Sequence, residues 1–175
     1  MFTCVYCGTQ FLEHKPNCSN CGAALKADSN PARESSGQKS AFTMIYKVCD
    51  QYQDNPSIYF DDSIDPARMK NALSNLNIPE NERVIMLYDD TVFNINNKVG
   101  FAICEQGIYW KNDWSVDTKR NHLPWLAFAE REIVRDGYHI SLGKGDRIGM
   151  AGCGSDEIRE KVIAMLKEIQ ALLRR

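Results

Sequence analysis

Four cysteines near the start of the chain have the types and the spacing of a metal site. Cys4 and Cys7 form one C-x-x-C-G unit, and Cys18 and Cys21 form a second one after a gap of ten residues. A two-residue spacer lets both thiolates of a pair bind one ion, and four thiolates complete the tetrahedral shell of a structural Zn²⁺. The glycine after each pair allows a tight turn beside the sulfurs. The spacing therefore predicts one zinc ion bound by these four side chains.

The length of the gap limits how this site could be built. It is shorter than the usual gap of about 15–20 residues between such pairs, so it has room for a single tight hairpin. His14 lies in this gap, and we expect it at the hairpin tip because four thiolates already fill the zinc shell. Two disulfides are the alternative, but nothing at the N-terminus directs the chain to an oxidising compartment. Zinc binding is therefore favoured.

No other group of residues predicts catalysis. Asp89 and Asp90 are adjacent, so on a strand their side chains point to opposite faces and do not converge on one substrate. No cysteine outside the first segment stands in a nucleophile motif with either His122 or His139. We expect the remaining cysteines to be small buried hydrophobic residues, namely Cys49, Cys104 and Cys153.

Three residues of the later chain are candidates for partner binding. Residues 143–147 read Gly-Lys-Gly-Asp-Arg, which lacks the spacing of a phosphate loop and predicts a hairpin turn. The cations Lys144 and Arg147 leave open a contact with an anion. Trp114 lies in the polar loop 112–120, which we expect to be an accessible surface. Trp114 is either packed on its own domain or held out as an anchor for a partner, and we expect the second, with a second copy of the chain as one candidate partner.

The charge balance disfavours several partners. The chain has 21 Lys and Arg against 23 Asp and Glu, and neither residues 1–40 nor residues 41–175 are basic. Affinity for nucleic acid or for an anionic membrane comes from neutralising negative charge, so both are disfavoured. No apolar run is long enough to cross a bilayer and no signal peptide is visible, which predicts a cytoplasmic protein.

The middle of the chain reads as a linker followed by two helices. Residues 26–40 contain no large apolar residue, which predicts a flexible linker. Apolar residues spaced by three and four predict helices over residues 42–52 and 66–77. Asp65 is the expected cap of the second helix, with Pro66 in its first position.

From residue 80 onward the pattern predicts short strands and a final helix. Strands are expected over residues 84–88, 91–93, 99–104, 108–111, 138–142 and 147–151, with one or two more over 121–132 that carry Trp125 and Phe128. The last twenty residues predict an amphipathic helix capped by Ser155. Its buried stripe would consist of Ile158, Val162, Met165, Leu166, Ile169, Leu172 and Leu173. Such a pattern predicts a small barrel or sandwich of about seven strands closed by the helix.

Two parts of the chain resemble known families. Residues 1–25 are similar to the short zinc ribbons of many bacterial proteins, because of the paired C-x-x-C-G units and the closing Gly-Ala-Ala-Leu. Residues 56–175 resemble the bacterial pleckstrin-homology-like (PH-like) domains. The similarity lies in a strand ending in Tyr-Asp-Asp-Thr, a Gly-Ile-Tyr-Trp hairpin and a later tryptophan before the last helix. This resemblance implies a seven-stranded barrel or sandwich, and many members of the family bind proteins or self-associate.

The sequence thus predicts a mainly β protein with two modules, a zinc ribbon over residues 1–25 and a PH-like domain over 80–175. Between them we expect a linker over 26–40 and a helical lead-in over 41–79. We expect a non-catalytic adaptor that binds another protein or a second copy of itself. A nucleic-acid-binding regulator that uses the ribbon is the alternative, and lipid or membrane-surface association through the PH-like domain is the next.

Overall fold

A computed structural model of the chain describes residues 2–3, 10–11, 31–55, 57–91, 98–113, 116–153 and 155–174. For residues 2–3, 10–11, 31–40 and 153 it describes the backbone alone. The chain divides into two compact units, Met1–Ser40 and Ala41–Arg175. In the described residues, no helix has the length and apolar character needed to cross a membrane.

The described elements are helices and antiparallel strands. The helices are α1 (Pro31–Asp50), α2 (Pro66–Asn75), α3 (Trp125–Ala129) and α4 (Asp156–Leu173), with the 3₁₀ turns η1 (Asp61–Ser63) and η2 (Ala151–Cys153). The strands are β1 (Phe2–Thr3), β2 (Gln10–Phe11), β3 (Ile58–Phe60), β4 (Val84–Asp89), β5 (Gly100–Cys104), β6 (Gly107–Lys111), β7 (His122–Pro124), β8 (Val134–Asp136), β9 (His139–Ser141) and β10 (Arg147–Gly149).

The first unit contains one short antiparallel pair. Strand β1 pairs with β2, with Phe2 opposite Phe11 and Thr3 opposite Gln10. The predicted zinc ligands and His14 lie outside the described residues, namely Cys4, Cys7, His14, Cys18 and Cys21.

Helix α1 differs from the predicted boundary between linker and helix. It begins at Pro31, so residues 31–40 of the expected linker are helical. Proline is well suited to a first helical turn, and several of the residues that follow it have high helix propensity. Toward its end the predicted apolar face is confirmed, because Ile45, Val48 and Cys49 are all buried.

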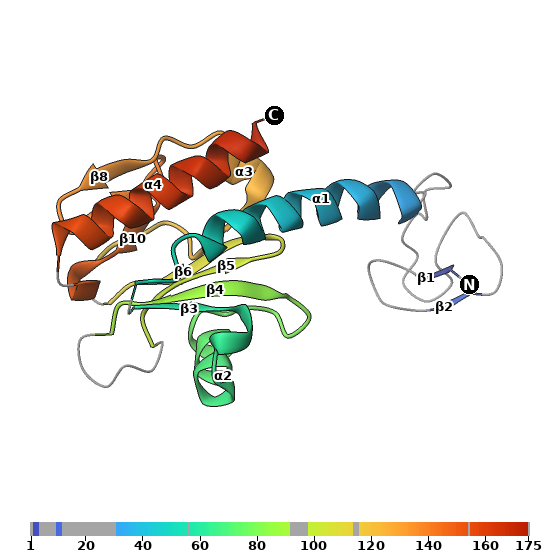
Figure 1. Cartoon of the computed structure of the whole chain (residues 1–175), viewed down its shortest axis with the longest axis horizontal. Coiled ribbons are helices and arrows are strands. Elements are labelled where there is room, and N and C mark those ends of the chain that lie inside the picture. Colours follow the sequence, from blue (N-terminus) through green and yellow to red (C-terminus); the bar gives the residue numbers. More distant parts are fainter. Residues whose placement is uncertain are drawn as a thin grey trace. The chain divides into compact units, whose positions relative to one another are not determined.

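The larger unit is built on a five-stranded antiparallel sheet whose order is β3-β4-β5-β6-β7. Side chains alternate across it, so Phe101 and Ile103 of β5 face one core while Ala102 and Cys104 face another. Helix α2 covers one face of the sheet, and α4 lies over the other (Figure 1). Because both faces are covered, all six residues of β4 are buried. Strand β3 comes from the predicted lead-in, which is therefore part of this unit.

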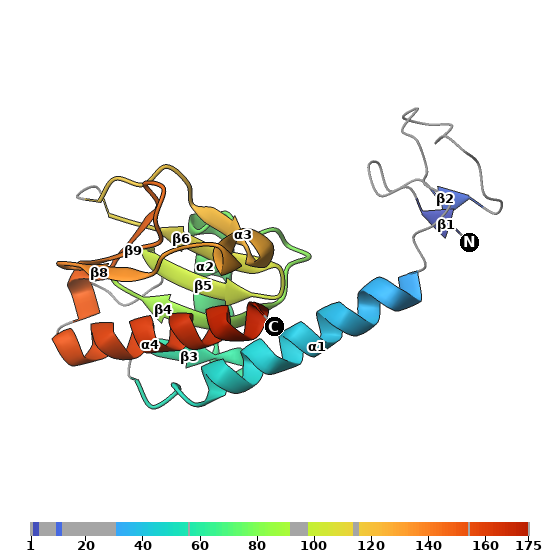
Figure 2. The ribbon, with the colours of Figure 1, turned by 90° about the horizontal axis from the view of Figure 1, so that it is seen from above.

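A second antiparallel sheet, of order β10-β9-β8, lies on the same side as α4 (Figures 1 and 2). The predicted pairing of the last two strands is confirmed, with Ile140 opposite Ile148. Strand β8 was not predicted, because its three residues are exposed and show no apolar alternation. The architecture is therefore mixed α and β, with sheets of five and three strands in the larger unit.

One predicted segment is wrong. Trp125 and Phe128 do not lie on a strand, because β7 ends at Pro124 and α3 begins at Trp125. A short apolar run such as Trp-Leu-Ala-Phe-Ala fits a buried helix as well as a strand, and its periodicity cannot distinguish them. Tertiary contacts favour the helix, since the Trp125 indole Nε1 donates to the Cys104 carbonyl at 3.1 Å.

Both predicted helix caps are confirmed. The Asp65 carboxylate accepts from the Arg68 amide at 2.9 Å, and the Ser155 hydroxyl accepts from the Ile158 amide at 3.2 Å. Of the predicted stripe of α4, Val162, Met165, Leu166 and Ile169 are buried in the core between the sheets, while Ile158, Leu172 and Leu173 are partly buried. The prediction of an amphipathic C-terminal helix is confirmed.

Candidate functional site

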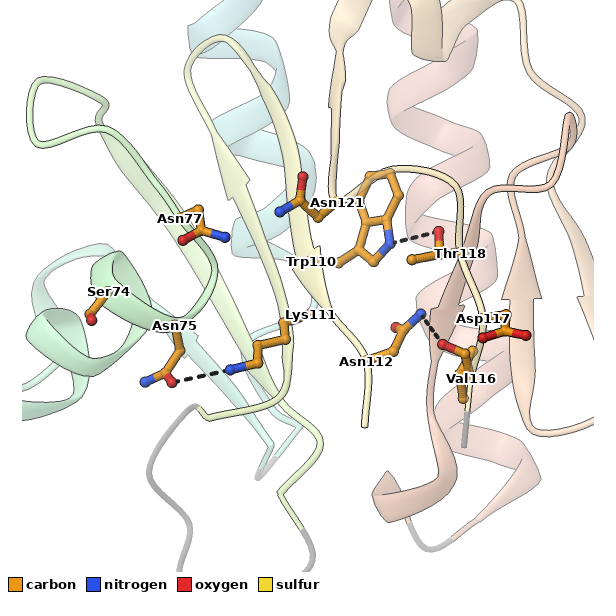
Figure 3. A pocket seen from close by; sticks show the side chains of 10 residues that line it. All are labelled: Ser74, Asn75, Asn77, Trp110, Lys111, Asn112, Val116, Asp117, Thr118 and Asn121. Atoms are coloured by element: carbon orange, nitrogen blue, oxygen red, sulfur yellow. Dashed lines mark hydrogen bonds between the residues drawn. The ribbon is translucent and has the colours of Figure 1, made fainter. Parts of the chain in front are cut away.

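A hollow of about 440 Å³ lies between the end of α2 and the loop that follows β6 (Figure 3). We call it the asparagine pocket, because four of the residues that line it are asparagines. Its lining consists of Ser74, Asn75, Asn77, Trp110, Lys111, Asn112, Val116, Asp117, Thr118 and Asn121. Much of this lining comes from the loop predicted as an accessible surface, residues 112–120.

The end of α2 places one wall of the pocket. Asn77 follows the helix with a φ of +54°, a left-handed conformation that asparagine tolerates better than most residues. The Ile78 amide then donates to the Leu73 carbonyl at 3.0 Å, which satisfies one of the last carbonyls of the helix. This cap ends α2 and leaves the Asn77 side chain exposed at the pocket.

The opposite wall is held by internal hydrogen bonds. The Asn112 amide group donates to the Arg147 carbonyl at 3.0 Å, and its oxygen accepts from the Gly149 amide at 2.8 Å. The Thr118 hydroxyl accepts from the Trp110 indole at 3.3 Å and donates to the Arg120 carbonyl at 2.8 Å. These bonds fasten the loop to β6 and β10, so this wall is rigid.

Three side chains of the pocket remain available for a ligand. Ser74, Asn77 and Asn121 are exposed and form no side-chain hydrogen bond with any described residue. Figure 3 shows the carboxamides of Asn77 and Asn121 turned toward one another. Lys111 is held beside them, because its Nζ donates to the Asn75 oxygen at 3.4 Å. The pocket therefore offers several hydrogen-bond donors and acceptors with a single cation.

The pocket lining offers binding chemistry and no evident catalytic pair. Its only charged side chains are Lys111 and Asp117, and none of the ten lining residues is a histidine or a cysteine. Elsewhere, burial raises the pKa of the Cys104 thiol well above its usual range, so the thiol stays protonated and unreactive. The His122 ring stacks on the Tyr109 ring, with 4.1 Å between the ring centroids.

The paired carboxylates singled out in the sequence have separate structural partners. Asp89 forms an ion pair with Arg68, with 3.0 Å between Oδ2 and Nη1. Asp90 accepts a hydrogen bond from the Gly152 amide at 2.8 Å, which fixes the turn before α4 to the end of β4. In the described residues, no group of three or more His, Cys, Asp or Glu side chains is arranged to hold a metal ion.

Asp90 should make the stability of the larger unit depend on pH. Burial raises the pKa of this carboxyl from 3.8 to about 7, although the Gly152 and Ala151 amides oppose the shift. The folded state then binds the proton more tightly than the unfolded state, so the free energy of unfolding falls as the pH rises from about 4 to about 7. We expect Asp90→Asn to raise that free energy by about 1–2 kcal/mol at pH 8.

Urea unfolding of both proteins at pH 4.5 and pH 8 measures this effect. The stabilisation should shrink at the lower pH, where Asp90 is largely protonated and resembles the amide. Asp117→Asn, which removes an exposed carboxylate, is the matched control and should change stability little at either pH. If Asp90→Asn is no more stable than the parent protein at pH 8, the expected effect of the raised pKa of Asp90 is contradicted.

The other candidate residues of the sequence lie apart from the pocket or outside the described residues. Lys144 and Arg147 are exposed at the turn between β9 and β10. Trp114 lies outside the described residues, within the loop that lines the pocket. Sequence patterns did not reveal Asn77 or Asn121. An asparagine directly after a predicted helix could have pointed to Asn77, but no local pattern marks Asn121.

No protein-family model matches the chain, and no curated protein or solved structure is significantly similar to it. Function is therefore inferred from the residues and geometry of the chain itself.

Proposed function

We propose that the protein is a non-catalytic, zinc-containing adaptor that binds a protein partner at the asparagine pocket. The observation that carries this proposal is the set of exposed polar side chains without a described hydrogen-bond partner, Ser74, Asn77 and Asn121, in a pocket with one wall held by internal hydrogen bonds. A preorganised site loses little conformational entropy when a ligand binds. Polar side chains without internal partners can exchange their hydrogen bonds to water for hydrogen bonds to a ligand.

The chemistry of the pocket fits a polypeptide better than the alternative partners. A carboxamide presents one acceptor and two donors, so it can pair with both the N–H and the C=O of a peptide group. Two such groups, Asn77 and Asn121, point toward one another in the pocket. Nucleic acid would need several cations for its phosphates, and Lys111 is the only cation among the described residues that line the pocket.

The zinc proposal rests on the N-terminal cysteines. Strands β1 and β2 pair on either side of residues 4–9, which contain the first C-x-x-C-G unit. This pairing forms a hairpin around the first pair of cysteines, whereas the hairpin predicted from the sequence lay between the two pairs. We assign one structural Zn²⁺ to Cys4, Cys7, Cys18 and Cys21, which would fold a segment too small to hold a core of its own.

The order of elements in the larger unit supports a PH-like domain. Four antiparallel strands, β4 to β7, are followed by the three strands β8 to β10 and then by α4. The number of described strands from β4 to β10 and the helix after them agree with what the resemblance implies, while β3 and α3 are additional elements. We therefore propose that residues 80–175 form a PH-like scaffold that carries one wall of the binding pocket, while the end of α2 carries the other.

The double variant Asn77→Ala/Asn121→Ala tests the proposed function. A tagged full-length chain should recover partner proteins from a lysate of the source cells, and recovery should fall about tenfold in the variant. Each lost hydrogen bond contributes about 1 kcal/mol, and tenfold corresponds to about 1.4 kcal/mol. The measurement is quantitative mass spectrometry of the recovered proteins, with the melting temperature of each variant as a check on folding.

Asn81→Ala/Gln106→Ala is the matched control, because it removes two exposed carboxamides outside the pocket. Recovery should remain at the level of the unmodified chain. Equal recovery by both variants would contradict the assignment of the pocket. Micromolar binding of random DNA or RNA with a steep dependence on salt would favour a nucleic-acid-binding regulator instead.

A further inference from the structure

The asparagine pocket contains one cation whose position is fixed by α2. Lys111 is the last residue of β6, and its Nζ donates to the Asn75 Oδ1 at 3.4 Å. Asn75 is itself held in place, because its Nδ2 donates to the Asn71 carbonyl at 2.8 Å within the same helix. Both polar atoms of the Asn75 side chain therefore have internal partners, and they hold the Lys111 ammonium at the pocket (Figure 3).

No acidic side chain of the described residues neutralises this ammonium. Lys111 forms no ion pair within the part of the chain that the structure describes. Figure 3 shows the carboxylate of Asp117, the one acid of the described lining, on the side of the pocket away from the ammonium. The last carbonyls of α2 attract the cation, but the Leu73 carbonyl already accepts the Ile78 amide. This side of the pocket therefore carries an uncompensated positive charge.

Several neutral hydrogen-bond donors line the same pocket. Asn77 and Asn121 each have two amide donors and Ser74 has a hydroxyl, and none of the three side chains forms a hydrogen bond with a described residue. A carboxylate has two oxygens that only accept, and its hydrogen bonds to a cation are stronger than those between neutral groups. A neutral peptide group would leave the ammonium without a countercharge. A carboxylate therefore matches this pocket better.

From this geometry we infer that the asparagine pocket recognises a carboxylate of its protein partner. The inference rests on the proposed function and narrows it, because it names the chemical group that the pocket binds. The carboxylate belongs either to an Asp or Glu side chain or to the C-terminus of the partner, since both present the same two oxygens. The hollow of about 440 Å³ has room for this group and the adjoining peptide, because ligand pockets begin at about 300 Å³.

NMR titrations of the isotope-labelled, full-length chain with short peptides test the inference. Acetyl-Gly-Glu-Gly-amide carries a side-chain carboxylate, and acetyl-Gly-Gly-Gly ends in a free carboxylate. Each peptide has a neutral match in which an amide replaces the carboxylate. At least one acidic peptide should shift the side-chain amide resonances of Asn77 and Asn121. It should also bind about tenfold more tightly than its neutral match, because it alone pairs with the Lys111 ammonium.

Lys111→Gln should abolish this preference, because glutamine keeps a donor but loses the charge. Lys70→Gln is the matched control, since it removes the same charge from an exposed position on α2 outside the pocket and should keep the preference. A preference for the first peptide alone identifies an acidic side chain, and for the second alone a C-terminus. Equal binding of acidic and neutral peptides, no binding at all, or the same loss in both variants would overturn the inference.

Recovery of partner proteins from the lysate separates this inference from the proposed function. If Asn77→Ala/Asn121→Ala lowers recovery while Lys111→Gln leaves it unchanged, the pocket binds its partner without a carboxylate, and only this inference fails. If neither variant lowers recovery, the pocket is not the binding site and the proposed function fails as well. A loss of recovery in both variants, together with the preference for an acidic peptide, supports both.

Discussion

Replacing Cys18 by serine should release the zinc ion and unfold the N-terminal ribbon while Ala41–Arg175 remains folded. A segment of about 25 residues cannot bury enough apolar surface to fold alone, so metal binding must supply the free energy. Structural Zn²⁺ contributes about 10–16 kcal/mol in such small sites. Metal analysis should find one zinc per chain before the substitution and none after it. Hydrogen exchange should show that amide protection is lost in residues 1–25 alone.

Two further variants make this test specific. Cys18→His supplies a ligand that zinc also accepts, so it should keep much of the metal. Ser19→Ala changes one of the two residues between the second pair of cysteines without removing a ligand, and this variant should bind zinc as the parent does. A protein that contains no zinc but still protects the amides of its first 25 residues would refute the metal site.

Replacing Arg131 by methionine should destabilise the larger unit by about 3–5 kcal/mol. The side chains of Arg131 and Asp146 are only 3% and 1% exposed, and their ion pair spans 2.9 Å. Removing the guanidinium leaves a buried carboxylate without its charge partner, which is far more costly than losing an exposed pair. The Gly143 carbonyl also loses a donor. Urea unfolding monitored by tryptophan fluorescence measures the change.

The double variant Arg131→Met/Asp146→Leu separates the charge from the packing. Because both charges are then absent, the double variant should recover a large part of the lost stability. Arg147→Met removes an exposed guanidinium from the same turn and should cost less than about 1 kcal/mol. If Arg131→Met and Arg131→Met/Asp146→Leu are destabilised by the same amount, the uncompensated charge of Asp146 is not the cause of the lost stability.

Several elements of the fold could be predicted because their signals are local. Asp65 and Ser155 cap their helices as predicted, since a capping side chain bonds amides only two or three residues away. The hairpin from β5 to β6 and the turn between β9 and β10 were also predicted, because glycine and alternating apolar residues mark them. The spacing of the four cysteines is also a local signal, but these residues lie outside the described part of the chain and the zinc site stays a prediction.

Other features were decided by contacts between distant segments. Trp125 and Phe128 lie on a helix and not on a strand because α3 packs against α4 and the Trp125 indole bonds carbonyls at the end of β5. Strand β8 exists because β9 offers it a partner, although its own residues carry no strand pattern. In both cases local propensity is weak, and the tertiary environment decides the structure.

The candidate sites divide in the same way. The sequence by itself predicted an accessible loop over residues 112–120 and a turn that carries Lys144 and Arg147, because polar composition and glycine spacing are read within a few residues. Only the tertiary structure places Asn77 across from Asn121, and Lys111 beside Asn75. Those pairs are 44 and 36 residues apart in the chain. Their proximity follows from how α2 packs on the five-stranded sheet, which no local pattern encodes.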